Sequence, residues 1–242
     1  MKSKIIKISI AIIVGILLLG LPLVAGYIAN ILPNKKLDPD GSFWWISIHH
    51  IAQAFLFVPL FILAKRFNPN IKFYLNKGDV SKGISYVWKF TLIFVIYTII
   101  SFAIVLISGT FTPFQHNINA NNVIGYLGFQ LLLSGPSEEL IFRSFGVAII
   151  AFIFPKRLVK GKFSVANLYI AIIFALAHIG IYFSPFYLSF SWIQIIYAFV
   201  LGMIYGDCFE KTKSVFYPMI LHSISNVIAV GATIVVTVIN GL

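Results

Sequence analysis

Apolar residues fill seven long runs of the chain, and short polar segments separate these runs. The runs are continuously apolar rather than alternating with a period of two, which argues against a transmembrane β-barrel. A helix needs about 20 residues to cross ~30 Å of hydrocarbon, and its backbone groups must be hydrogen-bonded within the segment. The pattern therefore predicts seven membrane helices, at residues 5–32, 43–64, 84–108, 122–154, 165–183, 187–209 and 215–239.

Composition supports the same fold class. Hydrophobic residues make up 60% of the 242 positions and charged residues only 10%, whereas an ordinary soluble domain carries about 25% charged residues. We therefore predict an all-α, polytopic membrane helix bundle in which residues 1–242 form one integral membrane domain, with a motif-bearing core at about 122–240. The first run follows three lysines, as in a signal peptide, but it is long for that role, and we expect a retained helix.

The formal net charge of +11 is distributed among the loops. Basic residues precede the first run and follow the second, fourth and sixth, rather than lining one folded face. This positive-inside pattern predicts a cytoplasmic amino terminus and an external carboxyl terminus, and no nucleic-acid partner. It requires residues 122–154 to cross once, as a helix that is tilted or broken near Pro136. We expect a multi-pass protein of a cell membrane, and the Ile- and Lys-rich, cysteine-poor composition suits a bacterial plasma membrane.

Three of the apolar runs carry polar side chains that lipid does not tolerate cheaply. An ionisable residue at membrane depth costs several kcal/mol by most estimates and is therefore a candidate for a functional site. The residues concerned are Glu138, Glu139 and Arg143 in the fourth run, His178 in the fifth, and His222 and Asn226 in the seventh.

Helical geometry relates these residues in pairs. Glu139 and Arg143 are four positions apart and share a helix face, so the arginine can neutralise that carboxylate. His222 and Asn226 are also four positions apart and face the same way. Glu138 points about 100° away from Glu139, which leaves it free to face a cavity between helices.

The three motifs, in order, resemble those of a known family. Residues 138–143 read EExxxR, residues 174–178 read FxxxH and residues 222–226 read HxxxN. This ordered trio in a helical membrane protein resembles the CPBP (CAAX protease and bacteriocin-processing, or Abi) intramembrane endopeptidases, which include the Ras-converting CAAX endopeptidase of eukaryotes. The resemblance covers about residues 128–230. The eukaryotic enzymes have eight membrane helices, so eight is the alternative to our count of seven.

The resemblance implies a peptide-hydrolysing site. It implies that Glu138 and His178 activate water, with Glu139 and Arg143 in support, and that His222 and Asn226 hold the oxyanion. Peptide hydrolysis needs both functions. The residues themselves agree, because two carboxyls in unequal surroundings suit a division of acid and base roles.

A metal ion is the alternative to a mechanism that uses only side chains. Glu138, His178 and His222 make a plausible zinc ligand set with an open fourth position. The sequence has no HExxH motif, however, and its histidines come from separate runs. We therefore favour a metal-free glutamate mechanism, with zinc as the alternative cofactor.

Two classes of function remain open from the sequence. The first is an endopeptidase that cuts membrane-associated peptides or proteins, for which the resemblance implies peptide maturation, bacteriocin immunity or quorum-peptide processing. The second is a non-catalytic membrane scaffold or immunity protein that sequesters a peptide or partner. A proton-relay transporter is a weaker third. Other polar residues receive little weight because they lie near the ends of runs or in loops: His49, His50, His116, Asp207 and Glu210.

Overall fold

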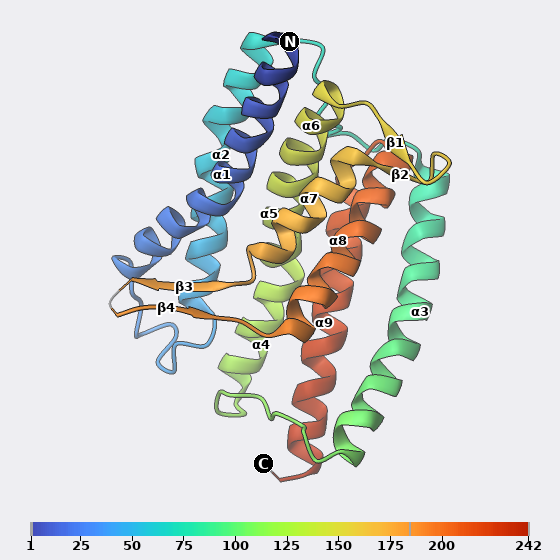
Figure 1. The fold of residues 1–242 in the computed structure, drawn as a ribbon. Coiled ribbons are helices and arrows are strands. Elements are labelled where there is room, and N and C mark those ends of the chain that lie inside the picture. The colour runs from blue at the N-terminus through green and yellow to red at the C-terminus, as the bar shows by residue number, and fades with distance from the viewer. Residues whose placement is uncertain (1, 184, 242) are drawn as a thin grey trace.

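Long helices lying side by side form the protein in the computed structural model, which describes residues 2–183 and 185–241 (Figure 1). Met1, Ser184 and Leu242, which the predicted domain of residues 1–242 includes, lie outside the described residues. The long unbroken helices are α1 (Lys2–Asn30), α2 (Trp44–Phe67), α3 (Val80–Ile107), α8 (Trp192–Thr212) and α9 (Phe216–Ile239). Within the described residues, these five helices are long and apolar enough to cross a membrane. The chain is therefore that of a multi-pass membrane protein.

One further helical path runs from Ala120 to Ile153 without leaving the helical state. Its consecutive segments are α4 (Ala120–Phe129), the π-helical η1 (Gln130–Ser134), α5 (Gly135–Glu139), the π-helical η2 (Leu140–Val147) and α6 (Ala148–Ile153). This path matches the predicted run at 122–154, and its π-helical segments lie on both sides of Pro136, where a break was expected. It is the central element of the bundle, since its segments contact α1, α2, α7, α8 and α9.

The predicted helix at 165–183 is wrong in its second half. Helix α7 covers only Val165–Leu176, about 18 Å at 1.5 Å per residue, which is too short to cross the bilayer. The backbone N–H of His178 bonds to the carbonyl of Ala175 and that of Ile179 to Leu176, so the helix closes in a tighter turn. The chain then continues as a strand hairpin, β3 (Gly180–Phe183) with β4 (Phe186–Ser189). Hydropathy alone could not separate these states, because apolar, β-branched and aromatic residues also suit a strand.

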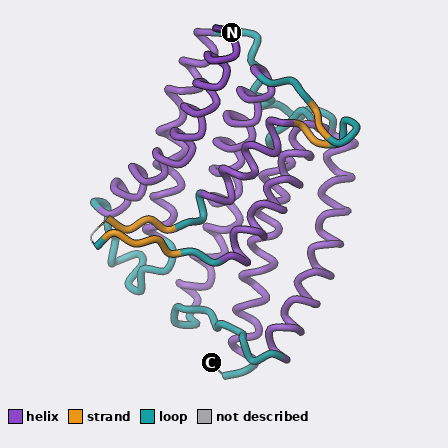
Figure 2. Tube along the Cα trace, viewed as in Figure 1, coloured by secondary structure: helices purple, strands orange, loops and turns teal. Residues whose placement is uncertain are grey.

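The hairpin also shortens the next predicted helix. Helix α8 begins at Trp192 rather than 187, and the Ser191 side chain caps it by accepting the Gln194 N–H. A second small hairpin, β1 (Arg157–Leu158) with β2 (Phe163–Ser164), precedes α7. In Figure 2 both hairpins lie at the edge of the helical bundle.

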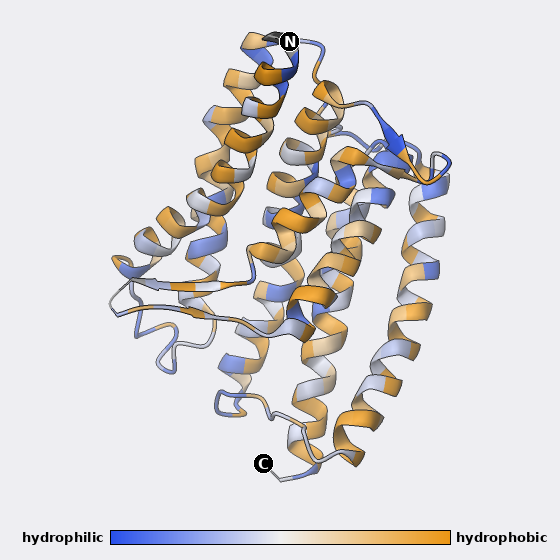
Figure 3. Cartoon of the chain, in the orientation of Figure 1, coloured by the Kyte–Doolittle hydropathy of each residue, from blue (hydrophilic) through white to orange (hydrophobic). Residues whose placement is uncertain are grey.

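The bundle is apolar outside and polar at its centre. Large apolar side chains are exposed on the long helices, such as Phe55, Ile93 and Ile193. The cartoon in Figure 3, coloured by hydropathy, shows that hydrophobic residues predominate along these helices. Lipid can solvate such faces, as it does in membrane proteins. Glu139 and Arg143, in contrast, are fully buried. The described ends of the chain lie at opposite ends of the bundle (Figure 1), as an odd number of crossings requires; which end is cytoplasmic stays a prediction.

Candidate active site

The two glutamates sit at the irregular part of the central helix. Proline has no N–H and its ring disturbs the preceding turn, so Pro136 cannot take part in a regular helical ladder. The wider π-helical turns on both sides accommodate this disturbance, and such turns are frequent at functional sites. Between them, the five residues of α5 carry Glu138 and Glu139.

Gly135 lets α5 approach α9 at backbone distance. A Cβ atom at this position would lie 2.9 Å from the Ser223 nitrogen and 3.0 Å from the Met219 carbonyl oxygen. The Ser223 hydroxyl in turn donates to the carbonyl of Leu131 in η1 at 2.8 Å. The close approach brings His222, the neighbour of Ser223, to the glutamates.

Glu139 connects an arginine and a histidine inside the bundle. Its Oε2 accepts from Arg143 Nε at 2.9 Å, and its Oε1 lies 2.9 Å from His222 Nδ1. The predicted pairing of Glu139 with Arg143 is therefore confirmed, and both side chains are 0% exposed. The guanidinium also lies over the rings of Phe174, at 4.8 Å, and Tyr205, at 5.9 Å. Cation–π contacts with aromatic faces help a buried arginine to tolerate the loss of water.

These contacts fix the orientation of His222. Because a carboxylate only accepts hydrogen bonds, Nδ1 carries the proton that bonds to Glu139. The other nitrogen, Nε2, then faces Glu138, 4.0 Å from Oε2. Tyr205 stacks on the imidazole with ring centroids 5.0 Å apart, and its hydroxyl pairs with Ser225 at 2.7 Å. Glu139 and Tyr205 thus hold the imidazole in place.

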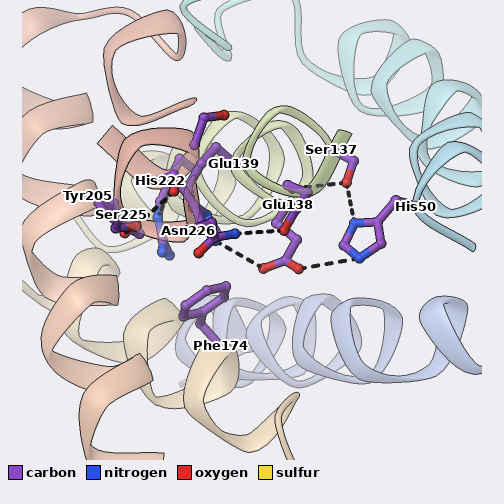
Figure 4. A network of polar contacts seen from close by, with 12 residues as sticks. His50, Ser137, Glu138, Glu139, Phe174, Tyr205, His222, Ser225 and Asn226 are labelled. Atoms are coloured by element: carbon purple, nitrogen blue, oxygen red, sulfur yellow. Dashed lines mark hydrogen bonds and ion pairs between the residues drawn. The ribbon is translucent and has the colours of Figure 1, made fainter. Parts of the chain in front are cut away.

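Glu138 has the more open of the two carboxylates. Its side chain is 19% exposed, and its two oxygens face imidazoles from different helices. Oε2 faces His222 of α9, and Oε1 lies 3.8 Å from Nε2 of His50 on α2. Figure 4 shows the carboxylate between the His50 ring on one side and the α9 side chains on the other. The site therefore joins three separate helical segments.

Sequence reasoning missed His50. It received little weight because it lies near the end of an apolar run, yet the residue is only 5% exposed and its ring faces Glu138. Its neighbour His49 is part-buried and stacks on Trp45 with ring centroids 5.3 Å apart. A signal was present, since His50 and Gln53 are three positions apart and share one polar helix face inside an apolar run.

Asn226 lies on the same face of α9 as His222, as predicted. Its amide nitrogen donates to the Ser134 hydroxyl in η1 at 3.0 Å. Both residues of the HxxxN motif therefore contact the central helix, one at η1 and the other at α5.

His178 is not brought into direct contact with the other candidates. It follows the end of α7, and its Nδ1 lies 2.8 Å from the carbonyl oxygen of Phe174. Within the described part of the chain, no hydrogen bond or ion pair joins it to Glu138. Phe174 links the two regions, because its ring contacts both His178, at 5.0 Å, and His222, at 6.0 Å.

This placement bears on the zinc alternative. Among the described residues, no three His, Cys, Asp or Glu side chains are grouped so that they could hold a metal ion. Of the three proposed zinc ligands, Glu138 and His222 face each other at 4.0 Å, whereas His178 bonds to the Phe174 carbonyl.

The remaining polar candidates lie away from Glu138. Asp207 and Glu210, at the end of α8, form ion pairs with Lys211 at 2.9 Å and with Arg157 at 3.3 Å, in keeping with the predicted helix terminus. A cavity of about 900 Å³ between α3 and α8 is lined mainly by apolar and tyrosine side chains, with Ser85 and Lys89, and does not include the glutamates.

A comparison with models of protein families finds a match in the second half of the chain. The family model described as type II CAAX prenyl endopeptidase Rce1-like matches residues 120–228, which include all six candidate site residues. No curated protein and no solved structure matches the chain.

Proposed function

Since residues 120–228 belong to the Rce1-like family of type II CAAX prenyl endopeptidases, we propose that this protein is an intramembrane endopeptidase that hydrolyses peptide bonds of membrane-associated peptides or proteins. One observation carries the proposal: the partly open carboxylate of Glu138 faces the imidazole of His222, whose other nitrogen is held by the buried Glu139–Arg143 pair. A structural ion pair alone would not require the second, open carboxylate.

In this proposal Glu138 is the general base. Its carboxylate takes a proton from a water molecule as the water oxygen attacks the scissile carbonyl carbon. The carbonyl then carries the negative charge of a tetrahedral intermediate. When the C–N bond breaks, Glu138 returns the proton to the leaving amine, which regenerates the carboxylate.

His222 and Asn226 would stabilise the oxyanion. The protonated form of His222 donates from both nitrogens, from Nδ1 to Glu139 and from Nε2 to the oxyanion. Glu139 and Arg143 act as positioning residues. Both side chains are fully buried, and Glu139 holds the imidazole of His222. His178 would assist water activation, which requires its ring to turn from the Phe174 carbonyl toward Glu138.

We keep the metal-free glutamate mechanism as the proposal and zinc as its alternative; the bond of His178 to the Phe174 carbonyl supports the former. The cellular role proposed is processing of membrane peptides, whether for peptide maturation, bacteriocin immunity or quorum signalling, in a bacterial plasma membrane with the amino terminus cytoplasmic.

The test uses purified protein in lipid vesicles. The probes are internally quenched, membrane-anchored peptides and a farnesylated CAAX peptide. Wild-type protein is expected to cleave at least one probe, and Glu138→Gln, at equal protein level and equal thermal stability, is expected to cleave none. Cleavage by both proteins at the same rate would refute the proposed mechanism. Cleavage by neither, with binding of a probe retained in both, would favour the scaffold function instead.

A further inference from the structure

His50 lies on α2, outside the part of the chain that matches the family model, yet its ring faces Glu138. It comes from the helix on the far side of the carboxylate from α9, as Figure 4 shows. This histidine is thus a separate contribution to the site, made by a segment that the family match does not cover.

The surroundings of His50 define which ring nitrogen carries the proton. Its Nδ1 lies 2.7 Å from the Ser137 hydroxyl and 3.0 Å from the amide nitrogen of Gln53. An amide nitrogen only donates, so Nδ1 must accept. In the neutral ring the proton is then on Nε2, and that N–H is directed at the Glu138 carboxylate.

Ser137 and Gln53 also hold the ring in place. The Gln53 amide donates to the Ser137 hydroxyl at 3.1 Å, and this hydroxyl lies 3.2 Å from the Ser134 carbonyl oxygen. Ser137 immediately precedes Glu138, so the same turn of α5 fixes both the base and the residue that orients His50.

The two oxygens of Glu138 therefore have different neighbours. Oε1 faces a donor, the Nε2–H of His50, at 3.8 Å, and Oε2 faces His222 at 4.0 Å. The 3.8 Å between Nε2 and Oε1 is longer than a direct hydrogen bond. A small rotation of the carboxylate would bring the two atoms into hydrogen-bond distance, and a water molecule would bridge them at the present distance.

We propose that His50 is a positioning residue for Glu138. Its Nε2–H holds Oε1, so that Oε2 stays directed toward His222 and the water to be activated. This inference rests on the proposed function of Glu138 as the base. A purely structural role is the competing explanation, because the His50 ring also packs edge-on against Phe129 at 4.9 Å.

Three substitutions of His50 separate these roles. His50→Phe keeps an aromatic ring against Phe129 and removes the N–H. His50→Gln places an amide N–H near the position of Nε2, whereas His50→Asn places its amide near Nδ1, toward Ser137. The matched control is His49→Phe, one position away on the same helix and stacked on Trp45.

We expect kcat for peptide cleavage to depend on whether residue 50 has an N–H donor at the position of Nε2. In the vesicle assay, on the quenched peptide that wild type cleaves fastest, His50→Phe and His50→Asn should lower kcat on the order of 10²-fold with little change in KM. His50→Gln should restore most of the loss, and His49→Phe should remain near wild type. Equal loss in all three His50 variants together with a lower Tm, or wild-type kcat in His50→Phe, would overturn the positioning role.

A second measurement needs no substrate and separates this inference from the proposed function. The Tm values of His50→Phe, Glu138→Gln and the double variant form a double-mutant cycle, in which residues in contact are non-additive. Non-additive values support the contact between His50 and Glu138, and additive values would overturn it. If Glu138→Gln is as active as wild type while the cycle is non-additive, the proposed function fails although the contact stands.

Discussion

The Glu139 carboxylate has both oxygens occupied, one by Arg143 and the other by His222, whereas Glu138 has no partner within hydrogen-bond distance among the described residues. The two neighbours in sequence therefore have different energetic roles. Glu139 pairs with the buried charge of Arg143, whereas the Glu138 carboxylate is not tied to a cation.

Substitution by glutamine should separate these roles. Removing one partner of a buried ion pair typically costs about 3–5 kcal/mol, because the remaining charge stays buried. We expect Glu139→Gln to lower the free energy of unfolding strongly and Glu138→Gln to change it little. Thermal unfolding of both variants in the same detergent checks this. Equal destabilisation by the two changes would contradict the inequivalence of the carboxyls.

Asn226 provides a residue-scale test of the oxyanion site. Loss of one oxyanion donor typically lowers turnover by about 10²–10³-fold. We expect Asn226→Ala to lower kcat by this amount with little change in KM, and Asn226→Asp, which replaces the donor with an acceptor, to be at least as damaging. Because Asn226 also bonds to Ser134, Ser134→Ala is the control for the lost structural bond and should retain most of the activity. Near-wild-type turnover in both Asn226 variants would show that Asn226 contributes to helix packing and not to the reaction.

At the scale of elements, the site depends on the close contact of α5 with α9 at Gly135. A methyl group there would meet the backbone of Ser223 and Met219 at 2.9–3.0 Å, and backbone atoms cannot move aside as a flexible side chain can. Gly135→Ala should therefore separate the two helices, lowering both Tm and activity.

The matched control for Gly135 is Gly128→Ala. Gly128 belongs to α4 of the same helical path, and a Cβ there would meet nothing within 4 Å. Alanine is also the better helix former by about 1 kcal/mol. Gly128→Ala should therefore be neutral or stabilising, and a wild-type Tm in Gly135→Ala would show that the α5–α9 contact is not tight.

The loop before α2 contains a capping carboxylate, Asp38. Its Oδ2 accepts the backbone N–H groups of Phe43 at 2.8 Å and Trp44 at 2.7 Å. Burial raises the pKa of Asp38, but hydrogen bonds from the N–H groups of Trp44, Phe43 and Ser42 outweigh it and leave the pKa below its usual value. The ionised carboxylate therefore stabilises the start of the helix that carries His50.

The sign of the pH dependence follows from this lowered pKa. The stabilisation is fully present above the unfolded-state pKa of about 3.9 and is lost as the pH falls through the lower folded-state pKa. We expect Asp38→Asn to reduce the free energy of unfolding at neutral pH by about 1 kcal/mol, as for a lost helix cap. Below about pH 4, the free energy of unfolding of the variant should fall less steeply with decreasing pH than that of wild type. If Asp38→Asn loses stability below about pH 4 as steeply as wild type, then other carboxyl groups cause the loss of stability in acid.

Hydropathy predicted the long helices well, because a lipid-facing helix must be apolar along its whole length. The same signal failed at residues 177–183, where the strand residues Ile181 and Tyr182 are as apolar as those of a helix. Helix spacing predicted the Glu139–Arg143 pair, since four residues bring two side chains onto one face.

Spacing could not predict which helices pack against each other. The contact of His50 with Glu138 spans 88 positions of sequence and depends on α2 lying beside α5. The position of His178 depends on where α7 ends, which was the boundary that hydropathy misplaced.

At the scale of the whole molecule, the bundle surrounds a small polar centre with apolar helices. Lipid cannot hydrogen-bond buried groups, and Glu139 binds both Arg143 and His222. The Nη1 and Nη2 atoms of Arg143 have no hydrogen-bond partner among the described residues, and the guanidinium lies over the rings of Phe174 and Tyr205. Glu138 is the member of this centre that keeps partial exposure. The geometry thus separates a fully buried ion pair from a partly exposed carboxylate.

The central claim is that Glu138 activates water for peptide-bond hydrolysis in the membrane. The most direct measurement is mass spectrometry of the products formed by the vesicle-reconstituted protein in H₂¹⁸O. The account predicts that the new carboxyl terminus of a cleaved membrane-anchored peptide contains ¹⁸O with wild type, and that Glu138→Gln of equal Tm forms no labelled product. Labelled product at the wild-type rate from Glu138→Gln would contradict the account.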